Sequence, residues 1–321
     1  MGGVTIRPFG RGDIAPVVAL WNRCLARDPM TEERFWRMFL LDANFDPAGA
    51  LVAADGGETV VGFLQAMARR VPYDGVGLQP EQGWITAFFV APERRRTGVG
   101  SRLLEGGLAF LRERGRTRVT CNGYAPHYVF PGVDEEYAEA HEFLEARGFA
   151  PASAAVAMGM PLEGSAVRMP ERVRQKRAEM EREGYAVRMF TQEDTLPLLA
   201  FADAHFPHWR ESLRESMLRG NAEIVLATHG AEVVGYTQWQ NPHNDPPHGA
   251  AGRFGPFGVH PDYRSKGVGA VIFYTLLERA AGSGSRYLWF GWAGGRNLSF
   301  YERAGCVVTR RFRLFTRAIE I

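Results

Sequence analysis

The stretch "RRTGVG" at residues 95–100 decides how this chain is interpreted. An apolar, strand-like run ends just before it at Val90, and a helical pattern follows it, with Leu104, Leu108 and Leu111 on one face. The first amides of a helix have no partner within the helix and attract anions, and glycines there let an anion approach the backbone closely. The stretch therefore predicts a loop that holds a phosphate or a diphosphate.

The same arrangement returns late in the chain as "RSKGVG" at 264–269, again after an apolar run and before a helical pattern. Three further landmarks recur in the same order, pairing 4–21 with 185–202, 51–63 with 224–236, and 140–149 with 297–306. Fixed-order similarity of this kind predicts a tandem repeat. We expect a first domain at 1–163, a charged linker helix at 164–184 and a second domain at 185–321.

Each copy predicts a mixed α/β domain. In the first copy, "LVAADGGETVVGF" at 51–63 indicates two strands joined by a Gly-rich hairpin, and "GWITAFFVA" at 83–91 indicates a buried strand. The glycine loop then leads through a helix to another strand, so antiparallel pairing comes first and a strand–helix–strand unit follows. We expect a mostly antiparallel sheet flanked by helices in each copy.

Composition excludes several classes of function. The 321 residues carry a net charge of +2, too small to indicate nucleic acid or a membrane as the main partner. The three cysteines, Cys24, Cys121 and Cys306, have neither metal-ligand nor disulfide spacing, which fits a reducing, cytoplasmic setting. The pair His205 and His208 lacks further ligands at a usual spacing, so we expect no metal site. The N-terminus has no signal-like apolar core, and no apolar run is long enough to span a membrane.

Two common phosphate loops do not fit the motif. A Walker loop needs Lys followed by Ser or Thr after its second glycine, and a dinucleotide loop needs a third glycine where Leu103 and Ile272 stand. Arg-x-x-Gly-x-Gly between a strand ending in Val-x-Pro and an amphipathic helix instead resembles the acyl-CoA loop of the GNAT N-acetyltransferase superfamily. The two copies carry that resemblance over nearly the whole chain, which would make the chain a tandem GNAT protein.

The resemblance implies acetyl-CoA as cosubstrate, with its diphosphate on the loop amides and its pantetheine arm paired like an extra strand with the preceding strand. The residues that it places at acetyl-CoA in the first copy are Phe88, Val90, Arg95, Arg96, Thr97, Gly98, Val99, Gly100 and Ser101. Those of the second copy are Phe257, Val259, Arg264, Ser265, Lys266, Gly267, Val268, Gly269, Ala270 and Asn297.

The resemblance also implies direct attack by an amine on the thioester, with a tyrosine that protonates the departing CoA thiolate. Tyr301, four residues before Gly305, stands at that position in the second copy; the alternative is an aromatic residue packed in the core. The first copy has Leu144 there. It could bind CoA without catalysis, use Tyr137, Tyr128 or solvent as the acid, or use its long aromatic insertion as an acceptor pocket.

The general base and the acceptor remain open from the sequence. Glu81 and His127 are candidate bases in the first copy, and His243 and His248 in the second. We expect a small-molecule amine or a peptide as the acceptor, and a monomer whose two domains mimic a dimer. The competing hypothesis is a CoA-binding module in which one or both domains have lost catalysis.

Overall fold

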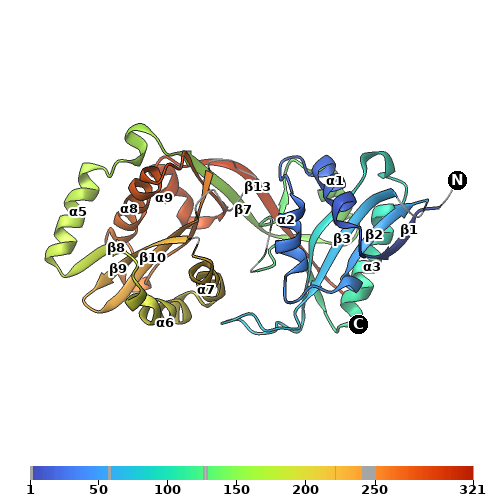
Figure 1. Cartoon of the computed structure of the whole chain (residues 1–321), viewed down its shortest axis with the longest axis horizontal. Helices are drawn as coiled ribbons and strands as arrows, with labels where there is room; N and C mark the ends of the chain where they lie inside the picture. The colour runs from blue at the N-terminus through green and yellow to red at the C-terminus, as the bar shows by residue number, and fades with distance from the viewer. Residues whose placement is uncertain are drawn as a thin grey trace. The chain divides into compact units, whose positions relative to one another are not determined.

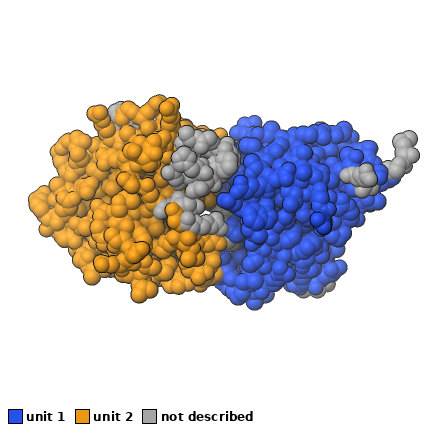
Figure 2. Space-filling model, viewed as in Figure 1, with its two compact units in different colours: residues 1–73, 77–155, 310–321 blue, residues 74–76, 156–309 orange. Residues whose placement is uncertain are grey.

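The computed structural model describes residues 3–56, 59–125, 127, 129–220, 222–240 and 251–320. The chain divides into two compact units (Figure 2). The first unit holds residues 1–73, 77–155 and 310–321, and the second holds 74–76 and 156–309. None of the helices in the described part of the chain is long and apolar enough to cross a membrane.

The sheet of the first unit is mostly antiparallel. Its strands are β1 (Thr5–Pro8), β2 (Ala50–Asp55), β3 (Thr59–Ala68), β4 (Gln82–Val90), β5 (Arg118–Cys121), the short β6 (Val133–Asp134) and the end of β13 (Val307–Ala318). β1 to β4 pair in sequence order and antiparallel, β4 pairs parallel with β5, and β13 pairs antiparallel with both β5 and β6. This is the mixed sheet that the repeat predicts.

Helices cover both faces of this sheet (Figure 1). They are α1 (Ile14–Cys24), α2 (Glu32–Phe35) with a π-helical turn after it (Trp36–Leu40), α3 (Val99–Glu113) and α4 (Ala138–Glu145). Phe89 of β4 contacts Trp21 of α1, whereas its neighbour Phe88 contacts Phe143 of α4. Successive strand residues point to opposite faces, so α1 and α4 lie on opposite sides of the sheet.

The second unit repeats the plan. Its strands are β8 (Tyr185–Met189), β9 (Ala222–His229), β10 (Glu232–Gln240), β11 (Ala251–Val259), β12 (Tyr287–Ala293) and the end of β7 (Ala150–Pro161). Its helices are α5 (Glu171–Arg182), α6 (Thr195–His205), α7 (Arg210–Arg219), α8 (Val268–Gly282) and α9 (Leu298–Arg303). The parallel pair is β11 with β12, the counterpart of β4 with β5.

The two sheets exchange their last strands. β7 follows the helices of the first copy, but its residues from Val156 onward pair with β12 in the second unit. β13 ends the second copy, but its residues from Phe312 onward pair with β6 and β5 in the first unit. The division predicted at 163 and 185 follows the repeats, whereas the compact units also group residues 310–321 with the first copy.

The predicted linker helix exists as α5, and it is less exposed than its charge suggests. Val173 and Met180 of α5 are buried in the core of the second unit. The backbone N–H of Met169, just before α5, donates to Glu278 of α8 at 3.1 Å. The charged residues therefore cover one side of a helix that packs on its own unit.

Candidate active site

A fork between two strands opens the sheet of the first unit. The parallel pairing of β4 with β5 extends only as far as Ile85 and Cys121. Just beyond, Thr86 is an extra residue in β4, because Gln65 pairs with Ala87 and Ala66 with Ile85. Such bulges bend a strand and re-aim its side chains, and they often occur beside active sites.

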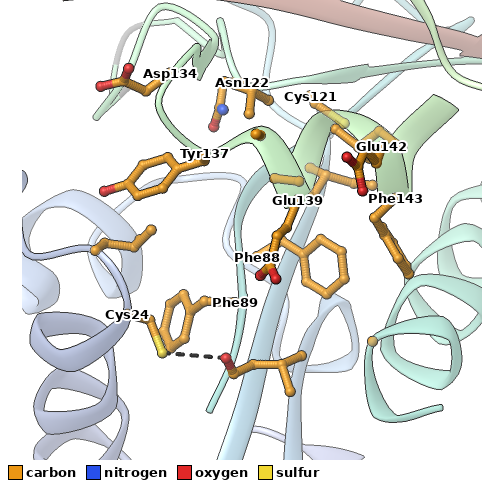
Figure 3. Close-up of a pocket in the computed structure, with 18 of the residues that line it drawn as sticks. Cys24, Phe88, Phe89, Cys121, Asn122, Asp134, Tyr137, Glu139, Glu142 and Phe143 are labelled. Carbon is orange, nitrogen blue, oxygen red and sulfur yellow. Dashed lines mark hydrogen bonds between the residues drawn. The ribbon is translucent and has the colours of Figure 1, made fainter. Parts of the chain in front are cut away.

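Beyond the bulge, one edge of β4 faces away from β3. The N–H of Ala91 donates to Val61 of β3, whereas the carbonyl of Val90 accepts from Arg95 Nε at 3.3 Å and from Cys24 Sγ at 3.5 Å (Figure 3). Backbone groups alternate along a strand, so the amides of Phe88 and Val90 face the fork. This edge can accept an extended partner as an added strand.

The glycine loop has one backbone conformation in both units. Gly98 and Gly267 have φ of +88° and +92°, and Arg96 and Ser265 have φ of +60° and +62°. Glycine is the residue that adopts positive φ at no steric cost, which explains its place immediately before α3 and α8. The first backbone amides of α3 and α8, which have no partner within their helix, therefore stand in the same position relative to each loop.

A cavity of about 870 Å³ joins the first loop to the fork (Figure 3). Seven of the nine residues predicted at acetyl-CoA in the first copy line it, namely Phe88, Val90, Arg95, Arg96, Gly98, Gly100 and Ser101. The other two point elsewhere, because Val99 is buried in the core and the Thr97 hydroxyl donates to the carbonyl of Arg94 at 2.7 Å. Which ligand the seven bind stays a prediction.

Charged side chains frame the loop end of the cavity. Arg95 Nη1 lies 3.0 Å from Glu139 Oε2, and Arg96 Nη2 lies 3.5 Å from Glu142 Oε2. Both glutamates belong to α4 (Figure 3), and all four side chains are largely exposed. The two arginines are therefore paired with carboxylates at the place where a diphosphate would bring its own negative charge.

The fork end of the cavity is mainly apolar. Burial raises the pKa of the Cys24 thiol, and it raises that of Cys121 to about 12. Both thiols line the cavity and stay protonated at neutral pH, so neither is prepared to act as a nucleophile. Tyr137 also lines the cavity, but its hydroxyl is buried without a hydrogen-bond partner among the described residues, and burial raises its pKa.

Several residues of the wall were not predicted from the sequence. Ile85 and Cys121 form the last pair before the fork, Leu144 of α4 also lines the cavity, and Arg310 and Phe312 reach it from β13. The repeat could have located the first three, because each has a counterpart in the second copy. No signal pointed to the last two, since they belong to the last strand of the second copy in the chain.

In the second unit the equivalent loop is less open. Arg264 Nε donates to the carbonyl of Val259 at 3.1 Å, as Arg95 does to Val90, and Lys266 Nζ lies 5.0 Å from the centre of the Tyr263 ring. Val268 is buried, and Ala270, Val259 and Phe257 pack against the core. Ser265 lies in the loop and Gly269 in the first turn of α8, and Gly267 is partly covered.

Tyr301, the predicted acid, is 7% exposed and belongs to the core of the second unit. Its ring lies 4.6 Å from that of Phe290 and 5.8 Å from that of Phe254. Burial raises its pKa, with Cys306 as a second cause. Asn297, one turn earlier, ends the short turn before α9. The catalytic role of Tyr301 stays a prediction.

The candidate bases are dispersed. Glu81 lies just before β4, at the far end of the strand from the loop, and its carbonyl accepts from the backbone of Thr117 and Arg118. His127 Nδ1 lies 2.9 Å from Asp42 Oδ2, outside the residues that line the cavity. His243, His248 and Tyr128 lie outside the described residues. Within the described ranges, no three His, Cys, Asp or Glu side chains are grouped to hold a metal.

The chain is similar to known proteins both in sequence and in fold. The family model described as "Acetyltransferase (GNAT) family" matches residues 16–149 and 187–306. A mycothiol acetyltransferase of Saccharopolyspora erythraea is 34% identical over 122 residues, which is 36% of this chain and 37% of that protein. The chain thus spans just over a third of the length of this curated relative.

Solved structures show the same fold. The glucosamine N-acetyltransferase region of a fungal multi-domain β-N-acetylglucosaminidase aligns over 98% of this chain and 38% of that one, with a TM-score of 0.83 and 20% identity. A tandem GNAT protein from the clavulanic acid biosynthesis pathway aligns over 98% of both chains, with a TM-score of 0.69 and 17% identity. At these identities the likeness concerns the fold.

Proposed function

Because the chain belongs to the acetyltransferase (GNAT) family, we propose that it transfers the acetyl group of acetyl-CoA to a primary amine at the cavity of the first unit. The observation that carries the proposal is one continuous cavity that runs from the glycine loop to the fork of β4 and β5. Members of this family use acetyl-CoA, and the cavity offers an anion-binding end and an apolar end.

The diphosphate of acetyl-CoA would lie on the amides at the start of α3, beside Arg95 and Arg96. Its pantetheine arm would extend along the open edge of β4, with backbone hydrogen bonds to Phe88 and Val90. An amide on this edge would also polarise the thioester carbonyl as negative charge develops on its oxygen. The thioester would then lie at the fork, near Ile85 and Cys121.

The amine attacks the thioester carbonyl directly, the C–N bond forms, and the C–S bond breaks. The thiols of Cys24 and Cys121 are protonated and therefore poor nucleophiles, which argues against an acetyl-cysteine intermediate at either residue. Leu144 cannot donate a proton, so water in the cavity would take the proton that the attacking amine loses and would protonate the departing thiolate. The acceptor that we propose is a small-molecule amine or a peptide. That the protein is a monomer and that it works in the cytoplasm stay predictions.

Binding and turnover test the proposal separately. Isothermal titration of acetyl-CoA into the full chain should show binding, and free CoA thiol should appear when an amine acceptor is present. No heat and no thermal shift at millimolar acetyl-CoA would overturn the proposal. Binding without thiol release across a broad amine panel would instead support the alternative, a CoA-binding module that has lost catalysis.

Gly100 offers a specific control. It lies in the first turn of α3 and lines the cavity, and a Cβ there would meet the rings of Phe143 and Phe88 at an ordinary 3.6 Å. Gly100→Glu should abolish binding, because its carboxylate would repel the diphosphate. Gly100→Ala should bind acetyl-CoA with a Kd within about threefold of the wild type, which is a change of about 0.7 kcal/mol in the free energy of binding.

A further inference from the structure

The two forks differ in the size of their side chains. Ile85 lies five residues before the last residue of β4, and Phe254 lies five before the last residue of β11. Gln82 pairs with Arg118 and Ala251 with Tyr287. Counting from these pairs, Cys121 of β5 corresponds to Phe290 of β12. At both positions the cavity-lining residue of the first unit is replaced by a phenylalanine.

The third position shows the same difference. Leu144 and Tyr301 each lie four residues before the glycine that follows their helix, Gly148 and Gly305. Both residues are buried, but Leu144 lines the cavity of the first unit, whereas Tyr301 packs against Phe254 and Phe290 in the core of the second. An aromatic ring again takes the place of a smaller side chain.

The three rings of the second unit pack on one another. The ring centres of Phe254 and Phe290 are 5.1 Å apart, those of Phe290 and Tyr301 are 4.6 Å apart, and those of Phe254 and Tyr301 are 5.8 Å apart. Ile85, Cys121 and Leu144 of the first unit are buried to the same degree, so the two forks differ in the volume of their side chains and not in exposure. Interiors pack at the density of organic crystals, so this cluster leaves no room for a thioester between the rings.

The loops differ too. Gly98 is exposed, and a Cβ built on it would meet no atom of the described residues within 4 Å. A Cβ on Gly267 would lie 2.7 Å from Cγ of Lys176 and 3.4 Å from its Cε. The aliphatic stem of Lys176 therefore lies across the second loop, and its amine pairs with Glu179 at 3.1 Å.

Helix α5 holds Lys176 in this position. Val173 and Met180, about one helical turn before and after Lys176, are buried in the core of the second unit. The start of α5 is bound to α8 through the backbone N–H of Met169 and Glu278. A diphosphate could reach the second loop only if the side chain of Lys176 moved away.

We propose that the chain binds one acetyl-CoA, in the first unit, and that the second unit is closed to it. Lys176 covers its loop, and Phe254, Phe290 and Tyr301 fill its fork. The inference rests on the proposed function, and it reverses the assignment that Tyr301 alone suggests, because the copy that carries the tyrosine is the closed one. The second copy of the repeat instead ends in residues 310–321, which belong to the first unit, where Arg310 and Phe312 line the cavity.

The stoichiometry of acetyl-CoA binding tests this inference on the full chain. Titration calorimetry should give one site in the wild type, none in Gly100→Glu, and one unchanged site in Gly269→Glu, the matching change in the second loop. Two sites in the wild type, or binding that survives Gly100→Glu, would overturn the inference and leave the proposed function intact. No binding to the wild type would instead overturn the proposed function.

A second titration tests whether the side chain of Lys176 blocks the glycine loop of the second unit. ADP carries the diphosphate without the pantetheine arm, so it needs the loop and not the fork. Lys176→Ala should raise the number of ADP sites from one to two. Lys176→Met keeps an unbranched stem without the charge and should retain one site. A single ADP site in Lys176→Ala would show that Lys176 is not the cover, and two sites in the wild type would contradict the cover directly.

Discussion

Arg310 and Asp28 form a bidentate ion pair across 282 residues of sequence. Arg310 Nη1 and Nη2 lie 2.5 and 2.7 Å from the two carboxylate oxygens of Asp28, and Arg310 Nε lies 2.8 Å from Asp134 Oδ2. All three side chains are nearly buried, and Arg310 and Asp134 line the cavity. The last strand of the chain thus builds part of the wall of the first unit.

We predict that Arg310→Met lowers the free energy of unfolding of the first unit by about 3–5 kcal/mol, because it removes the bidentate partner of the nearly buried Asp28 and one of the two arginines at the buried Asp134. It should also weaken acetyl-CoA binding, since the wall that contains Asp134 loses its brace. Urea unfolding followed by tryptophan fluorescence, and calorimetry, measure the two effects. Arg313→Met on the same strand removes only an exposed pair with Glu135 and should cost less than about 1 kcal/mol. Equal losses in the two variants would contradict the prediction.

The glutamates that hold the loop arginines should oppose acetyl-CoA binding. Replacing Glu139 and Glu142 by glutamine frees Arg95 and Arg96, and exposed pairs of this kind contribute about 0.2–1 kcal/mol each. We expect the Kd of acetyl-CoA to fall by about twofold to tenfold at low salt, with a smaller change at high salt because ions screen the charges.

Glu145→Gln provides the charge control for this experiment. Glu145 belongs to the same helix, and among the described residues it pairs with neither arginine. It should therefore leave the Kd nearly unchanged. A Kd that rises in the double variant, or that falls equally in Glu145→Gln, would exclude the competition between glutamate and diphosphate.

Tyr301→Phe separates the two interpretations of the second unit. The change keeps the ring among Phe254 and Phe290 and removes only the hydroxyl. If the second unit is closed, kcat and KM for acetyl-CoA should stay within about twofold of the wild type. A kcat loss of tenfold or more, equivalent to about 1.4 kcal/mol, would restore Tyr301 as the acid and refute the closure. Gly100→Glu serves as the inactive control.

An ion pair repeated in both units should govern stability in acid. Arg7 binds Asp13 through two bonds of 2.6 and 2.8 Å, and Arg188 binds Asp194 through two bonds of 2.7 Å. The arginine hydrogen bond is the largest cause that holds the pKa of each carboxyl below its ordinary value.

A carboxyl whose pKa is lower in the folded state stabilises the fold above its unfolded pKa, about 4, and this contribution disappears as pH falls through the folded pKa. We predict that Asp13→Asn and Asp194→Asn destabilise their own units at pH 7 and differ progressively less from the wild type below about pH 4. Urea unfolding from pH 7 to pH 2.5 measures this. A destabilisation that is constant over the whole range would contradict the prediction.

Local features of this protein were predictable from its sequence. The two glycine loops, the strand before each and the helix after each depend on residue periodicity and on the positive φ of Gly98 and Gly267, which short stretches of chain specify. The family and the tandem fold follow from these features, and both are confirmed. Seven of the residues predicted in the first copy do line one cavity.

Only the tertiary structure shows how the two copies differ at the fork and at the loop. The sequence predicted an acetyl-CoA loop in both copies and a catalytic tyrosine, Tyr301, in the second, but room for a ligand depends on the volumes of Phe254, Phe290 and Tyr301 once strands and helix meet. It also depends on where Lys176 of the preceding helix comes to lie. The exchange that brings Arg310 to Asp28 was likewise unpredictable, because strand pairing between distant segments is determined by contacts that no local pattern encodes.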